Sequence, residues 1–234
     1  MIKLSPRLEE ISNLIENNEM FIDIGCDHGF LSISLAKKYP NSQIIASDIN
    51  ENALNNAKKN IQKCHLEEKI TLTQSNGLEK INPSKKATII ISGMGSHTIV
   101  GILNQGYKKL KNVSTLILQS NNDLDFLRKK VTSLGYYIQK EKLVSDANII
   151  YTIIVFQKGF RFYTKKQIYL GPYLLKENTN LFQKKAQQDL QKLESFYQKI
   201  PKGHYQYRHL THWKIKILKK TLTKNEYNNK KNKN

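Results

Sequence analysis

The sequence has 234 residues, with 38 Lys and Arg against 19 Asp and Glu, which gives a formal net charge of +19. This length allows one domain of about 150 residues plus a smaller appendage. No run of roughly 18 uncharged apolar residues is present, and the N-terminus lacks the apolar core of a secretory signal. Two cysteines, Cys26 and Cys64, are too few for a disulfide framework or a cysteine zinc site. We therefore expect a cytoplasmic protein without a metal.

The positive charge is concentrated toward the end of the chain. Residues 1–158 hold 20 Lys and Arg against 15 Asp and Glu, a net of +5, whereas residues 159–234 hold 18 against 4, a net of +14. Basic residues gathered in one region, with aromatic residues among them, are typical of a protein that binds nucleic acid. An AT-rich genome, whose codons favour Lys and Asn, is the alternative explanation.

Up to about residue 158 the pattern predicts alternating helices and strands. In chain order it predicts a helix from Ser5-Pro6, a strand at 20–25, a helix ending before Pro40, a strand at 43–48, a helix at 50–57, strands at 70–73 and 87–91, a helix around 98–110, a strand at 115–119, a helix at 123–134, and two consecutive strands at 136–143 and 149–156. The last two strands are close enough in sequence to be antiparallel neighbours. We expect an α/β domain at residues 1–158, with a seven-stranded, mostly parallel sheet of the Rossmann-like class I methyltransferase type.

The remaining residues predict a second, helical domain at 159–223. From Leu174 to Ile200 apolar residues recur every three or four positions, and after a break at Pro201-Lys202-Gly203 a second apolar stripe follows. This pattern predicts a C-terminal α-helical hairpin that resembles a coiled coil. Residues 224–234 are almost all Lys and Asn, which predicts a disordered end.

The turn after the first strand carries the main functional signal. The strand ends in Asp23, and Gly25 and Gly29 follow it before a predicted helix. Glycine lets a ligand approach the backbone, and open parallel sheets bind ligands at the carboxyl ends of their strands. The next strand ends in Asp48, 25 residues after Asp23, where a carboxylate can accept both hydroxyls of a ribose.

Asp27-His28 lies between the two glycines, where a carboxylate would repel a pyrophosphate. We therefore expect S-adenosyl-L-methionine, which has an adenosine and no phosphates, as the cofactor. Asn76 after the third strand is expected to meet the adenine edge, with a simple Asn-Gly turn as the alternative. The expected cofactor-binding residues are Asp23, Gly25, Cys26, Gly29, Asp48, Ile49, Asn76, Gly77, Ser92 and Gly93.

The fourth strand ends in Ser92-Gly93-Met94-Gly95, which lacks the Asn-or-Asp-Pro-Pro motif of amino-methylating enzymes. Two glycines leave room for a flat base, and Met94 offers a soft apolar contact; a tight turn after a buried strand is the alternative. We expect His28, Met94 and Gly95 to contact the substrate. For Asp27 two roles stay open: a catalytic group beside the methyl donor, or a cap of the following helix.

Several motifs in the same order resemble the bacterial TrmK family, the tRNA adenine-22 N1-methyltransferases. They are Asp23-Ile24-Gly25-Cys26-Asp27-His28-Gly29-Phe30-Leu31, Ser47-Asp48, Asn76-Gly77-Leu78, Gly93-Met94-Gly95, Leu170-Gly171-Pro172 and Leu4-Ser5-x-Arg7-Leu8. The resemblance implies a methyltransferase domain followed by a helical tail, modification of N1 of adenine 22 in tRNA, and Asp27 as the catalytic candidate. Where the family often reads Gly-Met-Gly-Gly, this chain has Ser96 after Gly95.

The expected partner is tRNA, bound in part by Lys184, Lys185, Arg208 and Lys214 of the basic tail. No membrane and no obligate protein partner are expected, and the protein is expected to be a monomer. Three rival functions are possible from the sequence. One is a nicotinamide-dependent oxidoreductase, which Asp27-His28 disfavours; another is an S-adenosylmethionine-dependent methyltransferase acting on another substrate. The third is a non-catalytic RNA-binding protein, which would leave the cofactor turn unexplained.

Overall fold

The chain forms two compact units, Met1–Tyr173 and Leu174–Asn234. The computed structural model describes residues 3–83 and 86–231, with side chains up to Thr223. The first unit extends beyond residue 158, where the sequence pattern changes, because a buried ion pair fastens the following segment to it. In that pair Arg128 Nε lies 2.7 Å from Glu141 Oε1. Arg128 Nη1 also donates to the carbonyls of Ile168 and Tyr169, and the Tyr173 amide donates to Glu141 Oε2.

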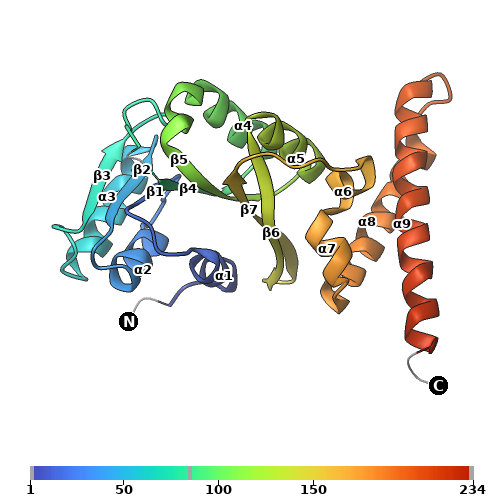
Figure 1. The fold of residues 1–234 in the computed structure, drawn as a ribbon, viewed down its shortest axis with the longest axis horizontal. Helices are drawn as coiled ribbons and strands as arrows, with labels where there is room; N and C mark the ends of the chain where they lie inside the picture. The colour runs from blue at the N-terminus through green and yellow to red at the C-terminus, as the bar shows by residue number, and fades with distance from the viewer. Residues whose placement is uncertain (1–2, 84–85, 232–234) are drawn as a thin grey trace. The chain divides into compact units, whose positions relative to one another are not determined.

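The first unit alternates strands and helices (Figure 1). Its strands are β1 (Met20–Ile24), β2 (Gln43–Asp48), β3 (Ile70–Gln74), β4 (Ala87–Met94), β5 (Val113–Ser120), β6 (Tyr136–Asp146) and β7 (Ile149–Lys158). Its helices are α1 (Pro6–Leu14), α2 (Phe30–Lys38), α3 (Glu51–Gln62), α4 (Ser96–Gln105), the 3-10 helix η1 (Tyr107–Asn112), α5 (Leu124–Ser133) and α6 (Lys165–Leu170). The helix predicted around 98–110 is thus divided at Gly106, where a Cβ would come within 2.5 Å of Leu78 Cδ1.

The seven strands form one sheet in the order β3-β2-β1-β4-β5-β7-β6. The strands from β3 to β5 are parallel, and β7 runs antiparallel to both of its neighbours. This arrangement confirms the predicted fold class. The order of the strands reverses between β1 and β4, and that switch point is where doubly wound sheets place their ligands.

Helices on both faces of the sheet complete two hydrophobic cores. Successive side chains of a strand point to opposite faces. Ile22 accordingly belongs to the cluster that contains Leu127 of α5, while Phe21 belongs to the cluster that contains Leu35 of α2. Asp23 has the same parity as Phe21, so it faces α2 from within the sheet. The carboxyl ends of β1, β2 and β4 are held in place by this packing.

The second unit is a pair of contacting helices, α8 (Asn180–Lys199) and α9 (Tyr205–Lys231), preceded by α7 (Pro172–Glu177), which spans the boundary. Glu194 Oε1 of α8 lies 2.7 Å from Lys219 Nζ of α9, and the ring of Tyr197 contacts that of His212. The later residue of α8, Tyr197, contacts the earlier residue of α9, His212, so the two helices are antiparallel. This confirms the predicted helical hairpin.

Disorder was expected from Lys224, but the helical backbone of α9 continues to Lys231. Lysine is a good helix former, and extending an existing helix costs far less than starting one. Residues 232–234 of the predicted disordered end lie outside the described residues. Within the described part of the chain, no helix is both long enough and apolar enough to span a membrane.

Candidate cofactor and substrate site

The turn between β1 and α2 exposes its backbone at the sheet's switch point. Gly25, Asp27 and Gly29 all have left-handed backbone, with φ of 76°, 48° and 71°. The amides of Gly25 and Cys26 both donate to the carbonyl of Ser47 in β2, at 2.8 and 3.0 Å. Glycine adopts this backbone freely, whereas at Asp27 it costs about 1 kcal/mol. A non-glycine residue kept in this conformation beside a binding turn is a candidate for function.

Asp48 closes the turn from the neighbouring strand. Its Oδ2 accepts from the amide of Asp27 at 3.2 Å, and its Oδ1 accepts from the amide of Asn50 at 2.9 Å. The side chain is only partly buried, and each carboxylate oxygen has a further lone pair. Asp48 can therefore accept hydroxyl groups of a ribose while it stays fixed to the turn. Ile49 beside it is 64% exposed, as an apolar contact for a ligand requires.

Asp23 lies below the turn rather than at its surface. It is 4% exposed, and its Oδ2 accepts from the hydroxyl of Ser32 at 2.7 Å. Burial raises the pKa of Asp23 to about 6; the Ser32 hydroxyl opposes this shift, and the charge of Asp48 adds to it. Within the described structure, the contact of Asp23 with Ser32 fixes the strand end to α2, and its role toward a cofactor stays a prediction.

Cys26 is also buried, with 7% of its surface exposed. Burial raises the pKa of its thiol well above its ordinary value, and the carboxylates of Asp23 and Asp48 raise it further. The thiol therefore stays protonated and does not supply a thiolate nucleophile. This supports the interpretation of Cys26 as a small residue in the cofactor turn.

Asp27 and His28 are the exposed side chains of the turn. The carboxylate of Asp27 is 72% exposed and lies 3.7 Å from Nε2 of His28, which is 49% exposed. The His28 ring stacks on Phe30, with ring centroids 5.5 Å apart. Asp27 makes no N-cap contact with α2, whose N-cap is Gly29 with no side-chain hydrogen bond. The helix-cap alternative for Asp27 is therefore wrong, and the carboxylate faces solvent at the ligand edge of the sheet.

The end of β4 contains a β-bulge at Ser92–Met94, which we call the Gly93 loop and which is held by one buried side chain. Gln119 of β5 is fully buried, and its Oε1 accepts from the Ser92 hydroxyl at 3.0 Å and from the Gly93 amide at 2.9 Å. Its Nε2 donates to Asn121, whose own amide group donates to the Gly93 carbonyl at 2.8 Å. Both polar groups of the Gly93 backbone are thereby fixed. Ser92 and Gly93 are thus held in one conformation at the end of β4.

Met94 joins this loop to the cofactor turn. It packs partly against the main core, and its Cε lies 2.3 Å from the position that a Cβ on Gly25 would take. Any larger residue at position 25 would displace Met94. The predicted cofactor residue Gly25 and the predicted substrate residue Met94 are therefore direct neighbours.

Ser96, the departure from the family's Gly-Met-Gly-Gly pattern, points away from this loop. Its side chain is fully buried, and its Oγ lies 2.6 Å from the carbonyl of Asn122 and 2.9 Å from the hydroxyl of Ser120. The Ser96 amide donates to Asn122 Oδ1. The extra hydroxyl therefore connects α4 to the β5–α5 connection, and the side chain next to Gly95 is that of Asn122.

Arg7 is a site residue to which the sequence analysis gave no role. Its Nη1 donates to Gln119 Oε1 at 2.7 Å and would lie 3.1 Å from a Cβ on Gly93. The guanidinium also lies over the ring of Tyr151, 5.3 Å from its centroid. A cation thus sits directly at the Gly93 backbone. The available signal was its place in Leu4-Ser5-x-Arg7-Leu8, which carried the family resemblance.

The remaining predicted residues lie at two further places. Asn76 is exposed just after β3, and Gly77 has a φ of 56°, with Ile102 so close that only glycine fits. The predicted tRNA-binding residues Lys184, Lys185, Arg208 and Lys214 lie in the second unit. Among the described residues, no cluster of three His, Cys, Asp or Glu side chains could hold a metal ion.

Comparison with known proteins identifies the family. Residues 21–227 match the family model TrmK, described as tRNA (adenine(22)-N(1))-methyltransferase. The chain belongs to the TrmK family. The tRNA (adenine(22)-N(1))-methyltransferase of Bacillus subtilis is 32% identical over 205 residues, which cover 85% of this chain and 86% of that protein.

Two solved structures of similar proteins contain the cofactor or its product. Streptococcus pneumoniae Sp1610, crystallised with S-adenosyl-L-methionine, is 31% identical, with a TM-score of 0.84 over 94% of this chain and 100% of that one. M. capricolum TrmK in complex with S-adenosyl-homocysteine is 28% identical, with a TM-score of 0.80 over 94% of this chain and 98% of that one. The TrmK fold therefore covers nearly the whole of this chain, including its helical second unit.

Proposed function

We propose that this protein transfers a methyl group from S-adenosyl-L-methionine to N1 of adenine 22 in tRNA. Membership of the TrmK family is the observation that carries this proposal. The geometry of the candidate site supports the proposal as well. It combines the glycine turn after β1, the fixed carboxylate of Asp48 as an acceptor for ribose hydroxyls, and the hydrogen-bonded Gly93 loop. We expect this activity in the cytoplasm, because its substrate is tRNA.

The residues of the β1 and β2 ends fit the cofactor. Gly25 lets Met94 pack directly against the turn, Asp48 can accept the ribose hydroxyls, and Ile49 and Asn76 present exposed side chains for the adenine. When bound, S-adenosyl-L-methionine supplies an electrophilic methyl group on a sulfonium. Arg7 provides a positive charge at Gly93. We propose that its guanidinium pairs with the α-carboxylate of the cofactor.

The adenine is the nucleophile of this reaction. Its N1 carries an in-plane lone pair, which forms the new N–C bond while the C–S electron pair returns to sulfur. The positive charge thereby moves onto the adenine ring. Asp27 has an exposed carboxylate in the cofactor turn, so it can stabilise this charge as it develops. Since N1 takes part in base pairing, the target must be unpaired or displaced, which costs a few kcal/mol.

The reaction is tested with unmodified tRNA that carries adenine 22, incubated with the protein and labelled S-adenosyl-L-methionine. We expect 1-methyladenosine at position 22 and no methylation when adenine 22 is replaced by another base. Methylation of a different nucleotide, or of no nucleotide, would contradict the proposed function.

The assignment of Arg7 has a test that does not depend on activity. 5′-Methylthioadenosine keeps the adenosine but lacks the amino acid group of the cofactor. Arg7→Met should weaken binding of S-adenosyl-L-methionine about tenfold or more, as expected for a lost charged hydrogen bond, and leave 5′-methylthioadenosine binding unchanged. Calorimetry measures both. Equal weakening of the two ligands would mean that Arg7 only supports the structure of the loop.

A further inference from the structure

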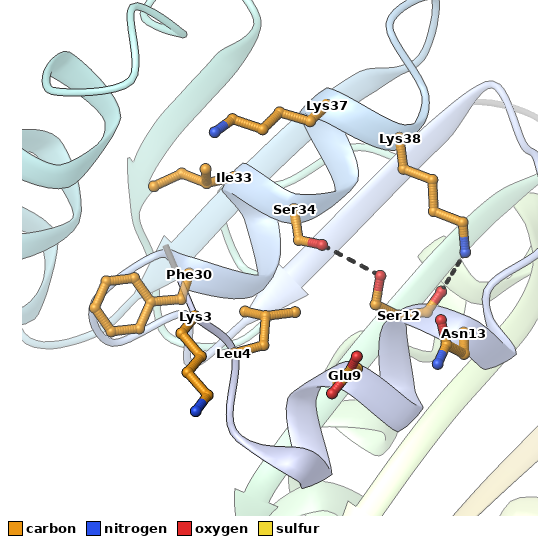
Figure 2. Close-up of a pocket in the computed structure, with 10 residues that line it drawn as sticks. All are labelled: Lys3, Leu4, Glu9, Ser12, Asn13, Phe30, Ile33, Ser34, Lys37 and Lys38. Atoms are coloured by element: carbon orange, nitrogen blue, oxygen red, sulfur yellow. Dashed lines mark hydrogen bonds between the residues drawn. The ribbon is translucent and has the colours of Figure 1, made fainter. Parts of the chain in front are cut away.

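A groove of about 560 Å³ runs between α1 and α2 on the surface of the first unit (Figure 2). Its volume is in the range of sites that hold small organic molecules. The cofactor residues described above do not line it, and neither does the Gly93 loop. The groove is therefore a separate feature that the proposed reaction leaves without a role.

One end of the groove begins at the cofactor turn. Phe30, which lines the groove, is the first residue of α2 and directly follows Gly29. The ring of Phe30 stacks on His28 with an angle of 18° between the two rings, and His28 lies beside Asp27. A chain of neighbouring side chains thus leads from the candidate catalytic carboxylate into the groove.

The groove has an apolar end and a polar end. Leu4, Phe30 and Ile33 form the apolar end, as Figure 2 shows. At the polar end the hydroxyls of Ser12 and Ser34 lie 3.3 Å apart. A nucleotide is divided in the same way, because its base has a flat apolar face and its ribose and phosphate are polar. An aromatic side chain such as Phe30 can stack on any base, because every base has a flat π face.

The charge of the groove fits an anion. Three lysines and one acidic residue, Glu9, line it. Lys38 Nζ donates to the carbonyl of Ser12 at 2.7 Å, so this ammonium group already has a hydrogen-bond partner on α1. Lys3 and Lys37 are exposed, and the described partner of Lys37 is the distant Sγ of Cys64, at 4.0 Å. Both lysines are free to reach a phosphate at the rim of the groove.

We propose that this groove binds one nucleotide of the tRNA strand next to the target adenine. Its base lies on Phe30 at the apolar end, and the two phosphates that flank the nucleotide pair with Lys3 and Lys37, one on each side of the groove (Figure 2). This inference rests on the proposed function, because the strand must pass the cofactor turn for adenine 22 to be methylated. Holding the neighbouring nucleotide also helps to keep the target base out of its stack, so the groove contributes to the positioning of the substrate.

Two variants test the groove: Phe30→Leu, and the double variant Lys3→Gln with Lys37→Gln. Both should raise the KM for tRNA about tenfold, while the Kd for S-adenosyl-L-methionine, measured by calorimetry, stays unchanged. In the double variant, the dependence of log K for tRNA on log salt should become less steep by about 1 to 2, since each phosphate contact contributes close to one. The matched control is Lys108→Gln with Lys111→Gln. Both are exposed lysines of η1, which directly precedes β5 and so lies at its amino end, whereas the cofactor turn follows the carboxyl end of β1.

Crosslinking tests the contact directly. The Phe30→p-benzoylphenylalanine variant is irradiated with unmodified tRNA, and the crosslinked nucleotide is mapped. A crosslink to a nucleotide that flanks position 22, together with the raised KM, supports the groove. If wild-type protein methylates adenine 22 but the groove variants match the η1 control, or if the crosslink maps elsewhere, the groove proposal is wrong and the proposed function stands. If wild-type protein does not methylate adenine 22, the proposed function fails first.

Discussion

Asp27 is the residue whose chemistry decides how much the cofactor turn contributes beyond binding. Its left-handed backbone and its exposed carboxylate occur at the same position, and its amide is bound to Asp48. Asparagine has nearly the same size and also tolerates left-handed backbone. A change from Asp27 to Asn therefore removes the charge and leaves the turn in place.

We expect Asp27→Asn to lower the single-turnover rate of tRNA methylation about a hundredfold, because the lost group acts mainly in the transition state. Binding of S-adenosyl-L-methionine, followed by calorimetry, should be unchanged, since the amide of residue 27 still donates to Asp48. A variant that methylates tRNA as fast as the parent would remove Asp27 from the mechanism.

Asp23 gives the protein a predictable dependence of stability on pH. Its pKa is 3.8 in the reference state and about 6 when folded, mainly because it is buried. The folded state therefore prefers the protonated carboxyl. As pH rises through this window, the unfolded chain releases its proton first, so Asp23 lowers the stability of the folded protein progressively between about pH 4 and pH 6.

Asp23→Asn should remove this loss, because its amide is neutral and can still accept from Ser32. Relative to the parent, the variant should gain on the order of 2 kcal/mol of unfolding free energy between pH 4 and pH 7.5, by conversion of the pKa difference. Urea unfolding at the two pH values, without cofactor, measures the gain. A difference between variant and parent that does not change with pH would show that Asp23 ionises as easily in the folded protein as in the unfolded one.

At the scale of the elements, Gln119 connects three segments that are far apart in the sequence. Its Oε1 accepts from Arg7 of α1 and from Ser92 and Gly93 of β4. Removing a buried acceptor leaves its donors unsatisfied, which costs about 1–3 kcal/mol for each uncompensated group. The geometry of the Gly93 loop thus depends on a residue of a different strand.

We expect Gln119→Leu to lower the melting temperature and to reduce the kcat of tRNA methylation at least tenfold, because the Gly93 loop loses its fixed position. Gln119→Glu is the matched comparison: it keeps the acceptor oxygens and should retain most of the kcat at saturating S-adenosyl-L-methionine, while its charge competes for Arg7 and raises the KM for the cofactor. Thermal unfolding and steady-state kinetics measure the two effects. If both variants lose the same activity, the acceptor oxygen is not what positions the loop.

The sequence predicted the elements better than the contacts between them. Strands such as β1 and β4 are short apolar runs, and a local signal of this kind is sufficient to find them. The contact between Arg7 and Gln119 joins residues 112 positions apart, and no local pattern reports it. The buried position of Ser96 and the break at Gly106 likewise follow from tertiary packing, with Leu78 as the neighbour that requires a glycine.

At the scale of the whole molecule, the basic charge lies mainly in the second unit, and the structure shows which of its cations have structural duties. Arg208 Nη1 donates to the carbonyl of Ile200, and its guanidinium lies 4.4 Å from the centroid of the Tyr197 ring. Lys185 is paired with Asp189 at 3.0 Å. Arg208 therefore also connects α9 to the end of α8, and Lys185 is paired within α8, so a loss of tRNA binding in variants of these residues could reflect altered folding.

Exposed lysines of α8 and α9 allow a cleaner test of tRNA binding by the second unit. The variant replaces Lys184, Lys192, Lys216 and Lys220 with glutamine. Each lost phosphate contact removes close to one unit from the dependence of log K on log salt, so the slope should become less steep by roughly 2 to 4. The melting temperature and the Kd for S-adenosyl-L-methionine should stay unchanged, because these side chains are exposed and lie outside the cofactor site.

The control is a variant with the same loss of charge in the first unit, with glutamine at Lys58, Lys108, Lys111 and Lys140, which are also exposed. General attraction to a polyanion depends on total charge and would weaken equally in both variants. Specific contacts by the helical pair predict a larger loss of tRNA affinity and of salt slope in the α8 and α9 variant. Filter binding of unmodified tRNA across a range of salt concentrations separates the two cases. Equal losses in both variants would mean that the second unit attracts tRNA by its charge alone and does not hold it at particular phosphates.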